Sequence, residues 1–173
     1  ENMNVCGRGG LGPLVVGFSP QLNTFIGGRG SGKSTVLESI RIAARQVESL
    51  TNESPDTYEN VRKFLSLSTH RDRGMMLNET EIILGINRRD QSYKLHWRFD
   101  GTGHTLEKLT EDGWSVLEEA ENLSERFPIL VYSQKQIHEL SRDTAGLLGI
   151  IDRSAEVNRS EWQARFTVLK NHY

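Results

Sequence analysis

The sequence is poor in cysteine and in long apolar runs. Cys6 is the only cysteine among 173 residues, which excludes an internal disulfide and is typical of a reducing compartment. We expect its thiol to be free and inert. The longest apolar run near the start, LGPLVVGF, is too short and too broken by Gly and Pro for a membrane span or a secretion signal. We therefore expect a cytoplasmic protein with no membrane partner.

The chain also lacks a marked excess of charge. Its formal net charge is -2, so the composition does not demand a nucleic acid as partner, and such a partner would need a local basic patch. With 36% hydrophobic and 25% charged residues, the composition is that of a soluble globular protein. Because the chain starts at Glu1, we expect a fragment or a processed protein. No spacing typical of zinc ligands is found among the histidines, which are His70, His96, His104, His138 and His172.

A glycine-rich stretch is the most informative feature that is present. Residues 27–35, GGRGSGKST, fit the phosphate-loop pattern G-x-x-x-x-G-K-[ST]. The apolar runs 14–18 and 22–26 precede it and predict two strands, and apolar residues at helical spacing follow it up to Val47. The polar face of this predicted helix carries Glu38, Arg41, Arg45 and Glu48. A strand, a glycine loop and an amphipathic helix in this order are the context that the motif requires.

The residue types in this stretch suit a bound triphosphate. Glycines let successive backbone N–H groups turn into one concavity, and the following helix presents its unpaired N–H groups to the same anion. Lys33 would neutralise the β- and γ-phosphates and act in catalysis, the Ser34 hydroxyl would ligate Mg²⁺, and Thr35 would cap the turn. Arg29 would contact a phosphate or a second protomer, or would simply be solvated. The expected nucleotide-binding residues are Gly27, Gly28, Arg29, Gly30, Ser31, Gly32, Lys33, Ser34 and Thr35. A glycine-rich turn that binds nothing is the alternative.

The middle of the chain changes from an irregular pattern to a period of two. Residues 48–80 are polar and predict an irregular surface insertion, apart from a short helix over 57–66. From 81 to 117, apolar and polar residues alternate and turn signals recur, which predicts an antiparallel meander of three or four strands. The alternating apolar positions are Ile82, Leu84, Ile86, Tyr93, Leu95, Trp97 and Phe99.

The last part of the chain predicts one more strand and then helices. Residues 128–132, PILVY, are expected to form a buried strand, and the chain is expected to be helical from Gln136 onward. Residues 128–153 would thus hold a strand, a loop and a helix, and 154–173 the start of a helical arm. One apolar stripe of that arm carries Trp162, Phe166, Leu169 and Tyr173. Together with residues 13–47, which hold the strands, the glycine loop and its helix, these segments predict one incomplete lobe over 1–173.

A self-contained small kinase or GTPase is one interpretation of the loop. Such an enzyme would place an apolar run ending in Asp behind the loop to hold Mg²⁺. The run LLGIID at 147–152 has this form, with Asp152 as metal ligand. However, Gly149 interrupts the run, and its flanks are typical of helix ends. The alternative is that Asp152 is not a metal ligand but a residue just before a helix that begins at Ser154.

A glutamine after the last predicted strand supports a second interpretation. In VYSQKQIHEL, residues 131–140, Gln134 follows the strand and precedes a helix. Its amide can accept a hydrogen bond from water and donate one to a phosphate without adding charge, which suits a contact with Mg²⁺ and water. Gln134 is therefore a candidate catalytic residue and, with Ser34, a candidate metal ligand.

The loop, the meander and this glutamine together resemble the N-terminal lobe of ABC-type ATPase heads of the SMC, RecF and SbcC kind. The stretches IGGRGSGKS and YSQKQIHELSRDTAGLLGIIDR are closer still to TrlF-like ATPases, in which such a domain follows a PHP-type phosphoesterase domain. The resemblance covers most of residues 13–153, with no counterpart for 48–80. It implies an α/β P-loop NTPase lobe with an antiparallel β-subdomain and a C-terminal helical arm. Residues 27–35 would be the Walker A segment, and Gln134 the Q-loop residue.

The parts that complete such a head are not found in the sequence. It has no LSGG-like signature, no convincing apolar run ending in Asp-Glu, and no downstream histidine switch. The resemblance implies that these parts lie in a C-terminal lobe and that ATP is hydrolysed only between two heads. We therefore expect this chain to hold half of a catalytic site, with ATP and Mg²⁺ as cofactors. By itself the chain is expected to be inactive. The required partner would be a second head, either in a homodimer or as the C-terminal lobe of the same protein.

The output of ATP binding is expected from the resemblance alone. It implies nucleic-acid processing, repair or defence against phage, with DNA or tRNA and a nuclease or phosphoesterase domain as partners. Arg88, Arg89 and the stretch HRDR at 70–73 are the candidate contacts with a phosphate backbone, and solvated turn residues are the simpler alternative. A third interpretation is a module that binds ATP only in order to assemble, without hydrolysis.

Overall fold

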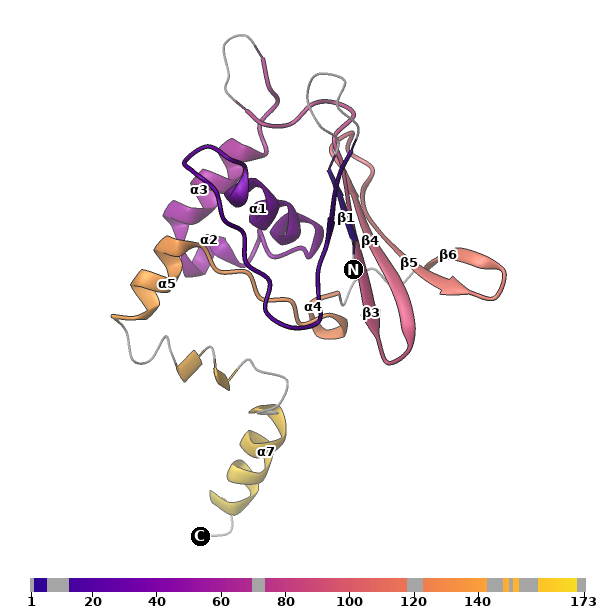
Figure 1. Ribbon diagram of the computed structural model, residues 1–173. Helices are drawn as coiled ribbons and strands as arrows, with labels where there is room; N and C mark the ends of the chain where they lie inside the picture. Colours follow the sequence, from indigo (N-terminus) through magenta and orange to yellow (C-terminus); the bar gives the residue numbers. More distant parts are fainter. Residues whose placement is uncertain are drawn as a thin grey trace. The chain divides into compact units, whose positions relative to one another are not determined.

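The computed structural model shows two compact units, Glu1–Val131 and Tyr132–Tyr173. The first unit holds a sheet with helices on one side of it, and the second unit holds helices (Figure 1). The structure describes residues 2–5, 13–69, 74–117, 123–142, 148–149, 151–152 and 159–170. In this described part of the chain, no helix has the length and apolar character needed to cross a bilayer.

An antiparallel sheet of six strands forms the framework of the first unit. Its strands lie in the order β2-β1-β3-β4-β5-β6. They are β1 (Asn2–Val5), β2 (Leu14–Gly17), β3 (Glu81–Arg88), β4 (Gln91–Arg98), β5 (Gly103–Thr110) and β6 (Gly113–Leu117). The last four strands are the meander expected over 81–117, so that prediction is confirmed. The strand expected over 14–18 is confirmed as β2.

The turn between β3 and β4 fixes the register of the meander. Arg88 pairs with Gln91, which leaves Arg89 and Asp90 as a two-residue turn. Both turn residues have positive φ, 50° and 60°. A type I′ turn requires this conformation at both positions, and its twist matches that of the flanking strands.

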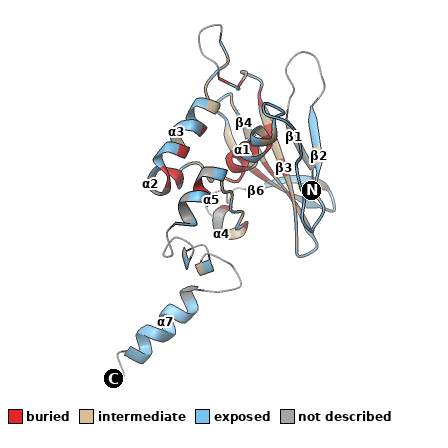
Figure 2. Cartoon of the chain, turned by 60° about the vertical axis from the view of Figure 1, so that its left-hand side comes forward, coloured by how far each residue is buried: buried red, intermediate tan, exposed pale blue. Residues whose placement is uncertain are grey.

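The apolar face of the meander forms the core of the first unit. Helix α1 (Lys33–Ala43) packs against β3 and β4, where the alternation of the sequence buries Ile82, Leu84 and Leu95. Figure 2 shows the buried residues on the helices and on the strands that face them. The buried cluster consists of Ile42, Ala43, Met76, Ile82, Leu84, Tyr93, Leu95, Leu106, Leu123 and Phe127. Burial of these apolar side chains is the main contribution to the stability of the first unit.

The opposite face of the meander carries a polar cluster. Glu81 Oε1 accepts a hydrogen bond from Arg98 Nε at 2.9 Å and also contacts His96 Nε2. Burial alone would raise the pKa of Glu81, but the hydrogen bonds from Arg98 and His96 outweigh it and lower the pKa below its usual value. Glu81 is therefore an ionised link between neighbouring strands β3 and β4.

Helix α1 ends in a Schellman motif without glycine. The N–H of Gln46 donates to the carbonyl of Arg41 at 3.0 Å, and the N–H of Arg45 donates to the carbonyl of Ile42 at 3.0 Å. This pattern requires a left-handed residue after the helix, and Arg45 takes that position with φ 55°. The helix expected up to Val47 therefore exists but ends earlier, at Ala43.

The insertion over residues 48–80 is more regular than the sequence predicted. It contains α3 (Pro55–Phe64), which confirms the helix expected over 57–66, and also α2 (Leu50–Glu53), which was not expected. Pro55 begins α3, where its missing N–H costs no helical hydrogen bond. Further on, the backbone at Gly74 passes close to the backbone at Ser66. A Cβ on Gly74 would lie 2.0 Å from the Ser66 carbonyl oxygen.

Two strands expected from the sequence are absent from the described part of the chain. Residues 22–26 and 128–132 are neither strand nor helix, so both predictions are wrong for this structure. Leu22 and Ile26 are 90% and 94% exposed. Apolar runs become strands only by pairing with a neighbour, and the six-stranded sheet is built from other segments.

The remaining helices are short or exposed. They are α4 (Leu123–Arg126) in the first unit, and α5 (Gln134–Leu140) and α7 (Arg159–Lys170) in the second. On α7 the apolar side chains of Trp162, Phe166 and Leu169 are exposed, as expected for a helix whose apolar stripe has no cover within the described part of its unit. Tyr173 and the residues 153–158 lie outside the described residues.

Candidate functional site

The glycine loop lies directly before α1, as the sequence predicted, but the strand expected over 22–26 in front of the loop is not formed. Residues 18–32 carry no helix or strand and lead into Lys33, the first residue of α1. Gly30 and Gly32 have φ values of 82° and 87°, which glycine adopts without strain. Gly32 is the N-cap of α1 and makes no side-chain capping bond. The helix therefore begins with backbone N–H groups that no side-chain cap covers, which is the arrangement that favours an anion.

The side chain of Lys33 folds back over its own loop. Its Nζ donates to the carbonyl oxygens of Gly27 at 2.6 Å and Gly28 at 2.8 Å, and to Ser31 Oγ at 3.1 Å. Three acceptors around one ammonium group hold the loop in a curl. The ammonium group of Lys33 therefore lies within the curl of the loop, against the backbone of Gly27 and Gly28.

The side chain of Ser31 packs closely against Gly27. A Cβ on Gly27 would lie 2.5 Å from Ser31 Oγ and 3.9 Å from Lys33 Nζ. No such obstacle exists at Gly28, where a Cβ would meet nothing within 4 Å. A side chain at position 27 would thus displace the Ser31 hydroxyl from its contact with Lys33, whereas Gly30 and Gly32 are needed for their backbone conformation.

The other predicted loop residues occupy accessible positions. Arg29 and Ser34 are exposed, and Thr35 is partly buried in the first turn of α1. The carbonyl of Thr35 accepts a hydrogen bond from Ser39 Oγ at 2.8 Å, one turn further along the helix. The hydroxyl of Ser34 is therefore accessible to a metal ion, whereas the expected capping role of Thr35 stays a prediction.

The residues of the loop fit a bound nucleotide phosphate and Mg²⁺. An uncapped helix start, two left-handed glycines and a lysine ammonium within the curl are the groups that stabilise a polyphosphate. Residues Gly27 to Lys33 would hold the phosphates, and Ser34 would ligate the metal ion. When bound, Mg²⁺ would neutralise charge on the phosphate oxygens.

A buried ion pair anchors the helix behind the loop. Arg41 is only 1% exposed, and its Nε donates to Glu38 Oε2 at 2.9 Å. Its Nη1 donates to the carbonyl of Val131 at 2.9 Å, across 90 positions of the sequence. The sequence placed Arg41 on the polar face of the helix, so its burial was missed. Helical periodicity contains no signal for it, because the partner carbonyl lies far along the chain.

Gln134 occupies the first position of α5 in the second unit, where it is exposed. The residue before it, Ser133, forms a capping box with Gln136. The N–H of Gln136 donates to Ser133 Oγ at 3.2 Å, and the N–H of Ser133 donates to Gln136 Oε1 at 2.8 Å. The S-x-x-Q spacing was a readable signal for this cap. Gln134 itself keeps an exposed side chain at a helix start, so its expected contact with Mg²⁺ stays a prediction.

Asp152 does not follow a strand. Residues 148–149 and 151–152 are helical, and Asp152 is partly buried among them. The kinase or GTPase interpretation needed an apolar strand that ends in this aspartate. That part of the interpretation is wrong, because the described residues of the run are helical.

Comparisons with known proteins add no assignment to this geometry. No protein-family model matches the chain, and no curated protein matches its sequence.

Proposed function

We propose that this chain is the ATP-binding lobe of an ABC or SMC-like ATPase that hydrolyses ATP when two heads associate. The observation that carries the proposal is the curled glycine loop, with the Lys33 ammonium within the curl, joined directly to the uncapped start of α1. Support also comes from the antiparallel meander, which the resemblance requires after this helix.

The residues of the loop have distinct roles in this proposal. Backbone N–H groups of the loop and of the first turn of α1 bind phosphate oxygens, and Lys33 exchanges its carbonyl contacts for contacts with phosphate. Ser34 orients the metal ion, and Gln134 is the proposed contact of water and metal. Because such catalysis depends on positioning and charge, Lys33 and Ser34 should contribute most.

The proposed partners are a second head and a nucleic acid. Nucleic-acid processing, repair or defence against phage rests on the resemblance, with DNA or tRNA as substrate and a nuclease or phosphoesterase domain as neighbour. Arg89 is exposed at the β3–β4 turn and Arg88 lies beside it, whereas residues 70–73 lie outside the described residues. Binding measured at two salt concentrations tests this part, because phosphate contacts weaken steeply with salt.

Substitution of the loop lysine tests the proposal. We expect Lys33→Ala to weaken Mg²⁺-ATP binding at least about tenfold, since a hydrogen bond to a charged group is lost, and to abolish turnover in the assembled protein. Isothermal titration calorimetry and phosphate release measure the two effects. Lys63→Ala is the matched control, because Lys63 is exposed on α3.

Three outcomes separate the competing functions. Unchanged ATP affinity in Lys33→Ala would contradict the assignment of the loop. Preference for GTP over ATP in competition would favour the self-contained GTPase. Tight ATP binding with association of two heads but no phosphate release would favour the module that binds ATP only to assemble.

A further inference from the structure

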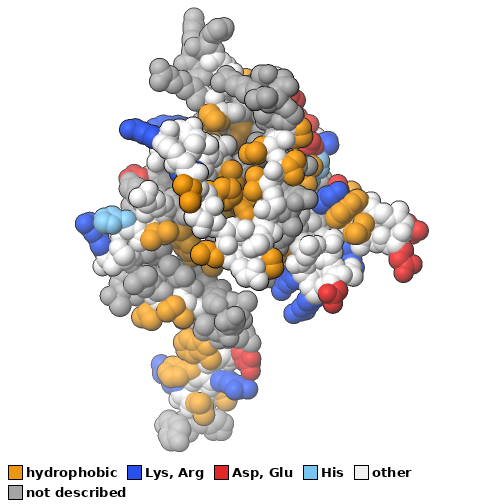
Figure 3. Space-filling model, in the orientation of Figure 1, with side chains coloured by type: hydrophobic (Ala, Val, Ile, Leu, Met, Phe, Trp, Pro, Cys, Tyr) orange, Lys and Arg blue, Asp and Glu red, His pale blue; other side chains and the backbone are white. Residues whose placement is uncertain are grey.

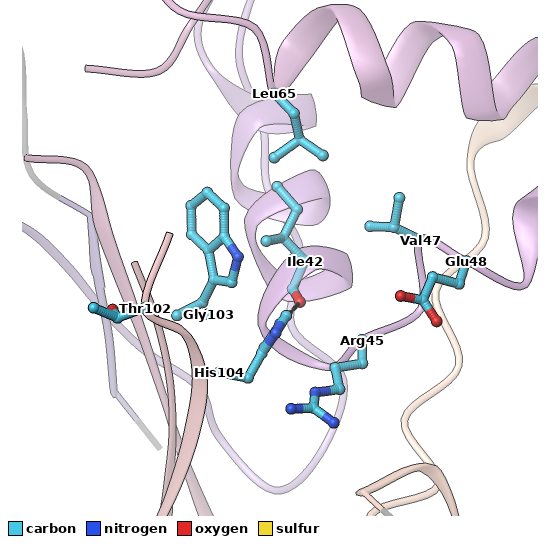
Figure 4. Close-up of a pocket in the computed structure, with 9 residues that line it drawn as sticks. Ile42, Arg45, Val47, Glu48, Leu65, Thr102, Gly103 and His104 are labelled. Atoms are coloured by element: carbon cyan, nitrogen blue, oxygen red, sulfur yellow. Dashed lines mark hydrogen bonds between the residues drawn. The ribbon is translucent and has the colours of Figure 1, made fainter. Parts of the chain in front are cut away.

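A cavity lies at the far end of α1 from the glycine loop. It has a volume of about 620 Å³ and opens between the end of α1 and the start of β5 (Figure 4). Typical small-molecule sites have about 300–1,000 Å³. It is lined by the apolar side chains of Val47, Leu65 and Trp97 and by the polar side chains of Arg45, Glu48 and His104. The 11 residues of α1 place about 16 Å between the loop and this cavity, at 1.5 Å per residue.

The apolar part of the lining suits a flat ring. Val47, Leu65 and the indole of Trp97 contribute apolar surface. Trp97 is held by an edge-to-face contact with Phe99, whose ring centroid lies 6.1 Å away. An indole that is fixed in this way is a stacking surface for another planar ring.

The polar part of the lining holds two hydrogen-bond acceptors beside the guanidinium of Arg45 and the hydroxyl of Thr102. His104 Nε2 lies 2.8 Å from the carbonyl oxygen of Ile42, and Figure 4 shows the ring directed at that carbonyl. A carbonyl only accepts, so Nε2 carries the hydrogen. Burial lowers the pKa of His104, and the charge of Arg45 lowers it further, against opposing effects of the Ile42 hydrogen bond and Glu48. The imidazole is therefore neutral at pH 7 and keeps Nδ1 as an acceptor, and the Glu48 carboxylate is a second acceptor at the rim.

We propose that this cavity is a ligand site for a nucleobase that carries an amino group, such as adenine or cytosine. A planar heterocycle would stack on Trp97, and its N–H donors would pair with Glu48 and with His104 Nδ1. The charges of Arg45 and Glu48, which both line the cavity, offset each other, so the lining favours a neutral polar ring over a free anion. An apolar guest would desolvate two acceptors without pairing them. The site is separate from the proposed phosphate site, because α1 lies between them.

Nucleosides without phosphate test the inference independently of the glycine loop. Adenosine and cytidine are expected to bind, and uridine, which lacks the amino group, is expected to bind about tenfold more weakly. Calorimetry gives the affinities, and NMR shift changes of His104 and Trp97 locate the ligand. Glu48→Ala should weaken adenosine binding about tenfold, because its carboxylate is removed from the exposed rim without a change in the core.

Two controls separate this site from the loop. Glu111→Ala, in the exposed β5–β6 turn, and Lys33→Ala should both leave adenosine affinity unchanged. The inference is overturned if no nucleoside binds at millimolar concentration, if uridine binds as well as cytidine, or if Glu48→Ala has no effect. Loss of adenosine binding in Lys33→Ala would assign the nucleoside to the loop and would likewise overturn it. Failure of this proposal leaves Mg²⁺-ATP binding at the loop untouched.

Discussion

His104 joins the meander to the loop helix through its hydrogen bond to the Ile42 carbonyl. Because burial lowers its pKa below the usual 6.5, the unfolded chain takes up the proton at a higher pH than the folded chain. The free energy of unfolding should therefore fall as the pH falls through 6.5, and this loss should level off below the folded pKa. Urea denaturation at several pH values between 8 and about 5 measures the effect.

A glutamine at position 104 isolates this contribution. In His104→Gln the amide N–H can still donate to the Ile42 carbonyl, but the side chain does not titrate. We expect a shallower pH dependence of stability than in the unsubstituted chain. His138→Gln, on the exposed surface of α5, should keep the original pH dependence. Equal slopes in the unsubstituted chain and in His104→Gln would show that another group is responsible.

Single residues also show where sequence reasoning stops. The pattern G-x-x-x-x-G-K-[ST] fixed the position of Lys33, because the motif is local and each residue has a backbone reason to be there. Arg41 and His104 could not be found in this way. Their partners, the carbonyls of Val131 and Ile42, lie 90 and 62 positions away, and any carbonyl can accept a hydrogen bond. Because every residue has a backbone carbonyl, no residue type in the sequence indicates which carbonyl will accept such a hydrogen bond.

Among the elements, α5 depends on its capping box. Ser133→Ala removes the hydroxyl that caps the N–H of Gln136, and loss of such a cap costs about 1 kcal/mol. We expect amide exchange in the first turn of α5, which begins with Gln134, to become about fivefold faster. Hydrogen exchange followed by NMR or mass spectrometry measures this change.

Another serine of the same segment provides the control. Ser141 follows α5, and its hydroxyl donates to the carbonyl of His138 at 2.8 Å, at the other end of the helix. Ser141→Ala should leave exchange in the first turn unchanged. If both variants exchange equally, the box does not control the start of α5. Gln136→Ala combined with Ser133→Ala should cost less than the sum of the two, because both remove one reciprocal pair.

The strands that could be predicted from the sequence are those that pair with the next strand along the chain. In the meander, each strand pairs with the next one along the chain, so the alternation over 81–117 and its turn residues were sufficient. Residues 22–26 and 128–132 are apolar, as a buried strand would be, but the sequence does not show which strand they would pair with. Pairing with a distant strand decides whether such runs become strands, and the structure gives them none.

At the scale of the whole molecule, an exposed apolar segment before the glycine loop should govern association. Figure 3 shows apolar side chains exposed on the face that it presents, and the exposed ones near the start of the chain include Leu14, Val15, Leu22, Phe25 and Ile26. We expect Leu22→Ser with Ile26→Ser to reduce concentration-dependent association, because apolar surface is removed. Sedimentation velocity over a range of concentrations measures it.

Stability is the internal check on this double substitution. Because Leu22 and Ile26 are at least nine-tenths exposed, the free energy of unfolding should stay within about 0.5 kcal/mol of the original value. Val116→Ser, on the exposed face of β6, removes an apolar side chain elsewhere and should leave association unchanged. Association that survives the double substitution would show that another surface is responsible.

The guanidinium of Arg41 also joins two distant parts of the first unit. Its bond to Val131 spans 90 positions of the sequence, so forming it has the loop-closure cost of a contact of long sequence separation. A shortened chain that ends before position 131 would leave a buried cation with one acceptor fewer. The helix that follows the glycine loop is therefore anchored in part by a residue at the opposite end of its unit.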